Sequence, residues 1–410
     1  MKLLLYIDPG TGSLLMSILI GFTITIVFSL KNIFYKVISL FTGKKYKGTN
    51  NFSGELVFFN EGVKYWNVFR PVLDELERQN QKFVYLTADK DDPGLNINPK
   101  ICNSYYLGDM NQALIALNKL RASMCVTTTP QLDIMVWKRS KYVKHYCYLH
   151  HSPVDIHSYK KFAFDYYDSV LCSSTYQMIN LRQLERDRNS KKKLLLKTGY
   201  TYYDIKVKER TGNSEHILIA PTWGDKSFFP SKGDFLIQIL LSKGHKVLYR
   251  PHPQSWISEK ALLVSIMSKY EKNNLFEIDK RVDNGYALSN ARLMIADNSS
   301  GVIHDVAFFY KIPIIAVDFT WDDGGYESSD IDEPASIKYL LDDVGKTISG
   351  ADISNINIVI EEVSKVKISR KIIDKHVFNY QRSGPVAAEQ IMSLLEGVNS
   401  VSNRNPKQYI

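Results

Sequence analysis

Two short motifs in the sequence place histidine beside proline, and histidine is the side chain best suited to proton transfer near neutral pH. The first motif, at residues 150–153, reads His-His-Ser-Pro, and the second, at residues 250–253, reads Arg-Pro-His-Pro. Two prolines restrict the backbone around His252, so its ring can donate to a leaving phosphate oxygen from a fixed position. Arg250 adds a planar fork of donors that suits a pyrophosphate. These residue types favour acid–base chemistry on a phosphorylated substrate.

A third polar segment, at residues 297–301, reads Asp-Asn-Ser-Ser-Gly and follows the apolar run 293–296. Ser299 and Ser300 are residue types that cap helices, and Gly301 allows a phosphate to approach closely. The apolar residues after this segment recur at helical spacing, so a helix is expected there. A strand, a polar turn and a helix N-terminus together predict a phosphate site. The alternative is an ordinary capped turn between a strand and a helix.

Strand-like and helix-like stretches alternate from about residue 55 to residue 317, a pattern that predicts parallel sheets with helices on both faces. Ligands of such sheets bind at the carboxyl ends of strands. All three motifs follow a predicted strand, and Thr128 and Thr222 lie at the ends of two others. The predicted strands are 56–59, 83–86, 125–128, 146–149, 170–172, 216–220, 246–249, 275–278, 293–296 and 314–317. The predicted helices are 68–79, 113–120, 176–186, 235–241, 257–267 and 282–289.

Composition narrows the class of partner. The chain has 410 residues, a formal charge of +9 and a pI of about 9.0, which suits nucleotides, phosphopolymers, an anionic membrane or nucleic acid. Nucleic acid is not expected, because no zinc-finger or RNA-binding signature accompanies the charge. A Gly-rich Walker loop and a GxSxG serine elbow are also missing from the sequence. The four cysteines are widely spaced, which predicts buried thiols in a reducing compartment.

No metal or cofactor is expected from the sequence. The cysteines form no CxxC pair and no cluster with histidine at metal spacing. Asp322 and Asp323 are adjacent acids before two glycines, and a solvated turn is the preferred interpretation of this pair over a metal site.

The N-terminal region predicts a membrane anchor. Residues 14–30 are apolar and uncharged, about the length that crosses a bilayer core. Five lysines and no acidic residue follow at residues 31–47, so the positive-inside rule places the rest of the chain in the cytoplasm. A cleaved signal peptide and a helix lying on the membrane surface are the alternatives. The basic stretch 182–197 predicts either a solvated helix end or a contact with anionic lipid headgroups.

Taken together and in order, four segments resemble the motifs of the CDP-glycerol glycerophosphotransferases, the teichoic acid primases and polymerases. They are His-His-Ser-Pro at 150–153, Ala-Pro-Thr-Trp at 220–223, Arg-Pro-His-Pro at 250–253 and Asp-Asn-Ser-Ser at 297–300. A segment at 379–388 also resembles the start of the family's C-terminal helix. The chain departs from the family at three positions, where His151 replaces glycine, Ser152 replaces threonine and Asn298 replaces tyrosine.

The resemblance implies a GT-B-like α/β fold in which two Rossmann-like domains with parallel sheets face a cleft. The predicted domains are an acceptor domain at 46–205, a donor domain at 206–378, a crossing helix at 379–397 and a tail at 398–410. They follow the membrane anchor and basic segment at 1–45, although the family is often held to the membrane peripherally. The resemblance also implies metal-independent transfer of glycerol phosphate from CDP-glycerol to a hydroxyl, with release of CMP. His150 would be the base and His252 the second catalytic residue. The predicted substrate ligands are Arg250, Asp297, Ser299, Ser300, Gly301, Thr222, Ser152 and Thr128, of which Thr128 and Gly301 are predicted from their position and residue type alone.

The prediction is therefore a phosphotransferase of cell-envelope polymer synthesis, anchored in the inner membrane of a bacterium with its catalytic part in the cytoplasm. Its expected partners are CDP-glycerol, a membrane-linked or polymer hydroxyl acceptor and the anionic membrane surface. Two alternatives stay open: a GT-B glycosyltransferase that uses a nucleotide sugar in capsule or lipopolysaccharide synthesis, and a non-catalytic anchored scaffold that binds nucleotides.

Overall fold

The computed structural model describes residues 52–134, 137–205, 214–224, 227–281, 284–318 and 324–404. The predicted membrane span at 14–30 and the basic residues after it lie outside these ranges, so the anchor stays a prediction. Asp322 and Asp323 lie outside them as well. Of the helices in the described ranges, none combines the length and the apolar composition that crossing a membrane requires.

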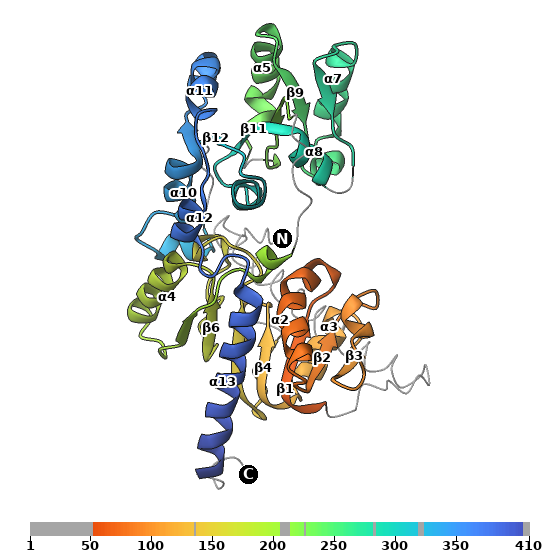
Figure 1. The fold of residues 1–410 in the computed structure, drawn as a ribbon, viewed down its shortest axis with the longest axis vertical. Helices are drawn as coiled ribbons and strands as arrows, with labels where there is room; N and C mark the ends of the chain where they lie inside the picture. Colours follow the sequence, from red (N-terminus) through yellow and green to blue (C-terminus); the bar gives the residue numbers. More distant parts are fainter. Residues whose placement is uncertain are drawn as a thin grey trace, which may run out of the picture. The chain divides into compact units, whose positions relative to one another are not determined.

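The first sheet has seven parallel strands in the order β3-β2-β1-β4-β5-β6-β7 (Figure 1). Its strands are β1 (Ser53–Asn60), β2 (Phe83–Thr87), β3 (Cys102–Tyr106), β4 (Arg121–Thr127), β5 (Val143–Leu149), β6 (Ser169–Cys172) and β7 (Leu194–Lys197). The strands in the middle of the sheet read as continuous apolar runs because both of their faces are covered.

Neighbouring side chains of β1 enter different cores. Leu56 and Phe58 pack with α2 (Trp66–Arg78) and with the last long helix, α13 (Ser383–Arg404). Val57 and Phe59 pack on the other face with α3 (Met110–Leu117) and α4 (Thr175–Asp187). This alternation of side chains is what a strand period of two residues imposes on a covered sheet.

The second sheet has six parallel strands in the order β10-β9-β8-β11-β12-β13. Its strands are β8 (His216–Ile219), β9 (Lys246–Tyr249), β10 (Phe276–Ile278), β11 (Ala291–Asp297), β12 (Ile314–Val317) and β13 (Gly345–Ile348). One face packs against α5 (Phe229–Ser242), α7 (Lys260–Tyr270) and α11 (Ile356–Val363). The other packs against α8 (Gly285–Asn290), the segment after β11 and α10 (Ser336–Val344).

The chain returns to the first sheet through α13. Both carboxylate oxygens of Asp204 accept hydrogen bonds from the first backbone N–H groups of this helix, at Ser383 (3.0 Å) and Gly384 (2.6 Å). Gly384 lies directly against Pro71 of α2, so a side chain at this position would collide with the Pro71 backbone. The predicted return of a C-terminal helix is therefore present, and it is fixed at its first turn.

The predicted α/β class with two parallel sheets is confirmed, as are all ten predicted strands within a few residues. The sequence reading missed β3, β7 and β13. All three lie at sheet edges. β3 and β13 expose polar side chains, and β7 lies in a stretch that its lysines made look like a loop. The four cysteines are free and buried, as predicted.

Candidate active site at the carboxyl ends of β5, β9 and β11

His150 follows the last residue of β5 and is fully buried. Its ring lies between the rings of Tyr148, Tyr159 and Phe164, at centroid distances of 5.0, 5.8 and 5.3 Å. Nδ1 is 3.3 Å from the Tyr159 hydroxyl, and Nε2 is buried without a hydrogen-bond partner in the described residues. Burial, with a smaller effect of His151, holds the pKa of His150 well below its ordinary value. A general base must be accessible to the acceptor hydroxyl, and His150 is not accessible in this structure.

His151 is half-buried, and its ring is held from several sides. Nδ1 is 3.0 Å from the carbonyl oxygen of Thr128, at the end of β4, and 2.8 Å from the Tyr148 hydroxyl. The ring also packs on Tyr65 at a centroid distance of 4.8 Å, and the backbone carbonyl of His151 accepts a hydrogen bond from the Tyr200 hydroxyl at 3.0 Å. Burial lowers the pKa of His151, so the ring is neutral at pH 7.

Two predicted ligands lie beside this pair. The Thr128 hydroxyl is buried without a hydrogen-bond partner in the described residues, while its carbonyl faces His151. The Ser152 hydroxyl accepts a weak hydrogen bond from the backbone N–H of Val154 at 3.4 Å. The structure therefore brings Thr128, His150, His151 and Ser152 together at the carboxyl edge of the first sheet.

The second sheet presents Arg250 and His252 after β9. The Arg250 guanidinium pairs with Asp279 at 2.5 Å and also donates to the carbonyl oxygen of Arg281 at 3.2 Å. Asp279 is fully buried, and hydrogen bonds from both arginines help to keep its pKa below the ordinary value despite the opposing effect of burial. Arg250 is thus held in place by the carboxylate of Asp279. The sequence predicted Arg250 as a pyrophosphate ligand and did not predict this internal ion pair.

The ring of His252 has a defined orientation. Nδ1 accepts a hydrogen bond from the backbone N–H of Gln254 at 3.1 Å, so in the neutral ring the proton is on Nε2. Trp223 stacks near the ring at a centroid distance of 6.2 Å and an interplanar angle of 27°. Burial lowers the pKa of His252, and Glu259 offsets part of this effect. The predicted role of His252 as a donor agrees with this hydrogen bond.

Asp297, at the end of β11, is fully buried and organises the segment that follows β8. Its carboxylate accepts hydrogen bonds from the backbone N–H and hydroxyl of Thr222, at 2.5 and 2.9 Å, and from the Phe228 backbone N–H at 2.6 Å. The Ser227 hydroxyl is a further donor at 3.4 Å. Burial raises the pKa of Asp297, and these donors offset part of the increase. Asp297 therefore positions Thr222, Ser227 and Phe228, a role that its prediction as a substrate ligand did not include.

The turn after Asp297 differs from the expected capped helix. Ser300 is buried, and its backbone N–H donates to the carbonyl oxygen of Asp297 at 3.0 Å, while Ser299 is exposed. Gly301 is the N-cap of α9 (Val302–Asp305), and no side chain caps this helix. α9 is only four residues long and continues as a π-helical segment over Val306–Tyr310. The serine caps were a wrong prediction, and a helix this short lends little dipole to a phosphate.

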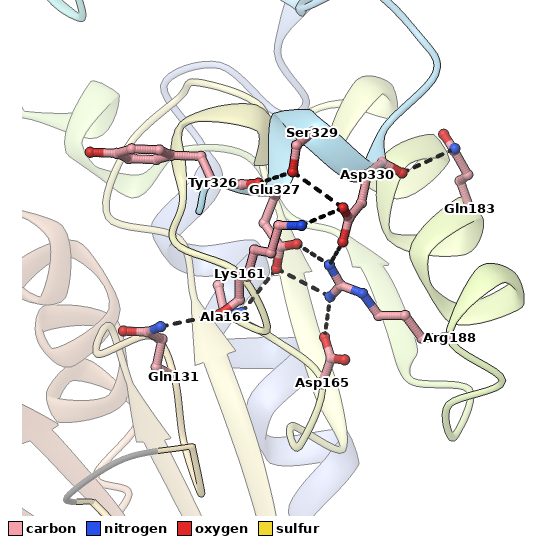
Figure 2. A network of polar contacts seen from close by, with 10 residues as sticks. All are labelled: Gln131, Lys161, Ala163, Asp165, Gln183, Arg188, Tyr326, Glu327, Ser329 and Asp330. Carbon is pink, nitrogen blue, oxygen red and sulfur yellow. Dashed lines mark hydrogen bonds and ion pairs between the residues drawn. The ribbon is translucent and has the colours of Figure 1, made fainter. Parts of the chain in front are cut away.

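A cluster of ionic contacts holds the segment after β12 against the first sheet's loops (Figure 2). Arg188 pairs with Asp165 and Asp330, both at 2.9 Å, and with Glu327, which is fully buried. Lys161 pairs with Asp330 at 2.7 Å. Burial raises the pKa of Glu327, and Arg188 offsets part of this increase.

The cluster reaches the histidines through the backbone. The N–H of Glu327 donates to the carbonyl oxygen of Tyr159 at 2.8 Å, and the hydroxyl of Tyr159 contacts His150. Arg188 and Lys191 belong to the basic stretch for which a solvated helix end and a lipid contact were the two predictions. Both are ion-paired within the chain, Lys191 with Asp168 at 3.0 Å. A solvated, internally paired surface explains this part of the stretch.

One chemical group was missed by the sequence reading. Asp305 follows His304 on α9, and burial raises its pKa to about 7, with an opposing effect of Tyr203. Its Oδ1 is buried without a hydrogen-bond partner in the described residues. No signal in the sequence distinguishes Asp305 from a solvated helix residue, because the tyrosines that interact with it come from residues 200–203, about 100 residues earlier.

A surface cavity of about 430 Å³ is lined by residues 197, 370, 374, 377–380 and 382, and none of the predicted site residues lines it. Where the structure describes the chain, no three His, Cys, Asp or Glu side chains form a group that could hold a metal ion.

The fold is similar to that of several solved structures. The chain is 11% identical to the UDP-GlcNAc 2-epimerase from Methanocaldococcus jannaschii, with a TM-score of 0.53 over 84% of this chain and 99% of that one. It is 10% identical to the UDP-N-acetylglucosamine 2-epimerase from Rickettsia bellii, also with a TM-score of 0.53, over 86% and 98%. A structure of the wall teichoic acid polymerase TagF is similar as well, at 14% identity, 91% and 98% coverage and a TM-score of 0.49.

These likenesses concern the fold, since at such identities the residues of a site are free to differ. No family model matches the chain, and no curated protein matches it in sequence. The class that fold and site define together is a two-sheet α/β protein of the GT-B type, with polar groups at the carboxyl ends of both sheets.

Proposed function

We propose that the chain transfers glycerol phosphate from CDP-glycerol to a hydroxyl acceptor in cell-envelope polymer synthesis and releases CMP. The observation that carries this proposal is the orientation of His252. The backbone N–H of Gln254 occupies Nδ1, which leaves an N–H at Nε2 to hydrogen-bond a phosphate oxygen. The ordered motifs that led to this family lie at the carboxyl ends of β5, β8, β9 and β11, where ligands of parallel sheets bind.

In the proposed reaction the acceptor hydroxyl loses its proton to a histidine at the end of β5. Its oxygen forms a bond to the distal phosphorus of the donor, while the bond from that phosphorus to the CMP oxygen breaks. His252 and Arg250 would stabilise the charge that develops on the bridging oxygen and on CMP. The products are a phosphodiester and CMP, so no oxidant or reductant is needed.

The same proposal keeps residues 14–30 as an anchor in the bacterial inner membrane and the two sheets on its cytoplasmic side. A membrane-linked or polymer acceptor would then meet the site close to the anionic surface. The basic composition supports an anionic partner of this kind.

The test uses the purified full-length chain in detergent with a panel of donors: CDP-glycerol, CDP-ribitol, UDP-glucose and UDP-GlcNAc. We expect CDP-glycerol to raise the melting temperature most and to give acceptor-dependent CMP, measured by mass spectrometry. Turnover of a UDP-sugar alone would favour the glycosyltransferase alternative. Nucleotide binding without release of CMP or UDP, whatever the acceptor, would favour the scaffold.

A further inference from the structure

The two adjacent histidines after β5 differ in how far they are buried. His150 is enclosed by aromatic rings, and its Nε2 is buried and unpartnered in the described part of the chain. His151 is half-buried, and its Nε2 is not one of the buried atoms that lack a partner in the described residues. Both rings pack against Tyr148 and Tyr159, so the two histidines differ in burial, and His151 is the one that can face an acceptor.

The hydrogen bonds of His151 define which nitrogen carries the proton. A carbonyl oxygen has no proton to give, so at 3.0 Å from the Thr128 carbonyl, Nδ1 must be the donor. The Tyr148 hydroxyl oxygen, 2.8 Å from the same nitrogen, is then a second acceptor. A neutral ring with its proton on Nδ1 has a lone pair on Nε2, which is the form a general base requires.

The ring is also held firmly enough to be positioned. Tyr65 and Tyr159 pack against it at centroid distances of 4.8 and 5.5 Å. The Tyr200 hydroxyl, from the segment after β7, holds the backbone carbonyl of His151 at 3.0 Å. A base that contributes to rate needs such restraint, since misplacement by about 1 Å can cost on the order of 10²-fold.

We propose that His151, and not His150, accepts the proton of the acceptor hydroxyl, with His150 as buried support beneath it. This inference rests on the proposed function. The proton passes from the hydroxyl oxygen to Nε2 of His151, the oxygen bonds to phosphorus, and the bond to CMP breaks. The position at which the resembling family has glycine would then carry the base in this chain.

The first test determines the protonation of the His151 ring and needs no donor substrate. Long-range ¹H–¹⁵N NMR of the ¹⁵N-histidine-labelled full-length chain reports which ring nitrogen carries the proton, and His151→Gln and His150→Gln assign the two signals by loss. We expect the Nδ1–H form for His151, with titration below its ordinary pKa, and no titration of His150. An Nε2–H form for His151, with Tyr148 donating to Nδ1, would overturn the inference.

The second test measures the rate of CMP release and its dependence on pH. We expect His151→Gln to lower kcat for CMP release by about 10²-fold or more and to remove the acid limb of the pH profile. The His150→Gln variant should shift the melting temperature and keep the acid limb. Loss of that limb in His150→Gln, with its retention in His151→Gln, would contradict the assignment.

A control separates this inference from the proposed function. His245→Gln changes a histidine at the amino end of β9 that contacts Asn357 and Arg292, so the acid limb should stay. A wild-type chain that releases no CMP from any donor would contradict the proposed function alone, because the NMR measurement of His151 is made without a donor.

Discussion

The carboxyl edges of the two sheets each present one partly exposed histidine, His151 after β5 and His252 after β9, and they differ in what faces Nδ1. His151 faces the carbonyl oxygen of Thr128, whereas His252 faces the backbone N–H of Gln254. The carbonyl places the proton on Nδ1 and leaves Nε2 an acceptor, and the N–H does the reverse. The same side chain thus becomes a base on one sheet and a hydrogen-bond donor on the other, through a single backbone group in each case.

The surroundings of the two rings differ as well. His151 lies among tyrosine side chains from four segments of the chain, while His252 is held by its own loop and by Trp223. The first centre therefore depends on contacts distant in sequence, and the second on local geometry. We expect changes far from the chemistry to affect the first centre more.

The largest effect should come from the donor side. His252→Ala removes the N–H that would stabilise the leaving CMP oxygen, and we expect kcat/KM for CMP release to fall by about 10²–10⁴-fold. His245→Ala, at the other end of the same strand, is the matched control. Circular dichroism should show both variants folded. Near-normal turnover by His252→Ala would contradict the role of His252 as a hydrogen-bond donor to the leaving group.

The sequence was sufficient for the fold but only in part for the site. Apolar runs predicted ten of the thirteen strands that the described residues form, because a buried parallel strand is recognisable from its own residues. The motifs also located the strand ends correctly. The choice between His150 and His151 could not be made, since it depends on Phe164, which packs against the ring of His150, and on Tyr65, which packs against the ring of His151.

Asp297 shows the same limit. Its side chain was predicted to bind substrate, and in the structure it accepts hydrogen bonds from Thr222 and Phe228, about 70 residues earlier in the chain. A residue type and its position after a strand indicate that a group is chemically active. They do not indicate whether the partner is a ligand or another segment of the chain.

The next effect concerns stability and tests the dependence of the first centre on distant contacts. Arg188→Met keeps the length of the side chain but leaves Glu327 buried without its cation. We expect the free energy of unfolding to fall by about 3–5 kcal/mol, measured by urea denaturation. The Tyr159 backbone should loosen, so the NMR signals of His150 and His151 should shift while that of His252 stays.

Arg78→Met is the control, since Arg78 is largely exposed and pairs with Glu75 on the helix surface. It should leave the denaturation midpoint unchanged. Equal shifts of all three histidine signals in Arg188→Met would show that the two centres do not differ in this respect.

The smallest effect should come from Asp305. Its carboxyl interacts with Tyr200 and Tyr203, and Tyr200 also donates to the backbone carbonyl of His151. Burial raises the pKa of Asp305 to about 7 in the folded chain, above its ordinary value of 3.8. Between these two values the folded state binds more protons than the unfolded state, so stability must fall as pH rises through this window.

The asparagine of Asp305→Asn cannot ionise, so the variant should lack the loss of stability that ionisation of Asp305 causes as the pH rises. We expect the variant to be more stable than the wild type at pH 8, by at least about 1.4 kcal/mol, the value of a single pKa unit, and to lose this advantage at pH 4. Denaturation midpoints across this range measure the difference. A pH dependence identical to that of the wild type would mean that the Asp305 carboxyl is solvated, and the tyrosines that interact with it would then have no influence on its ionisation.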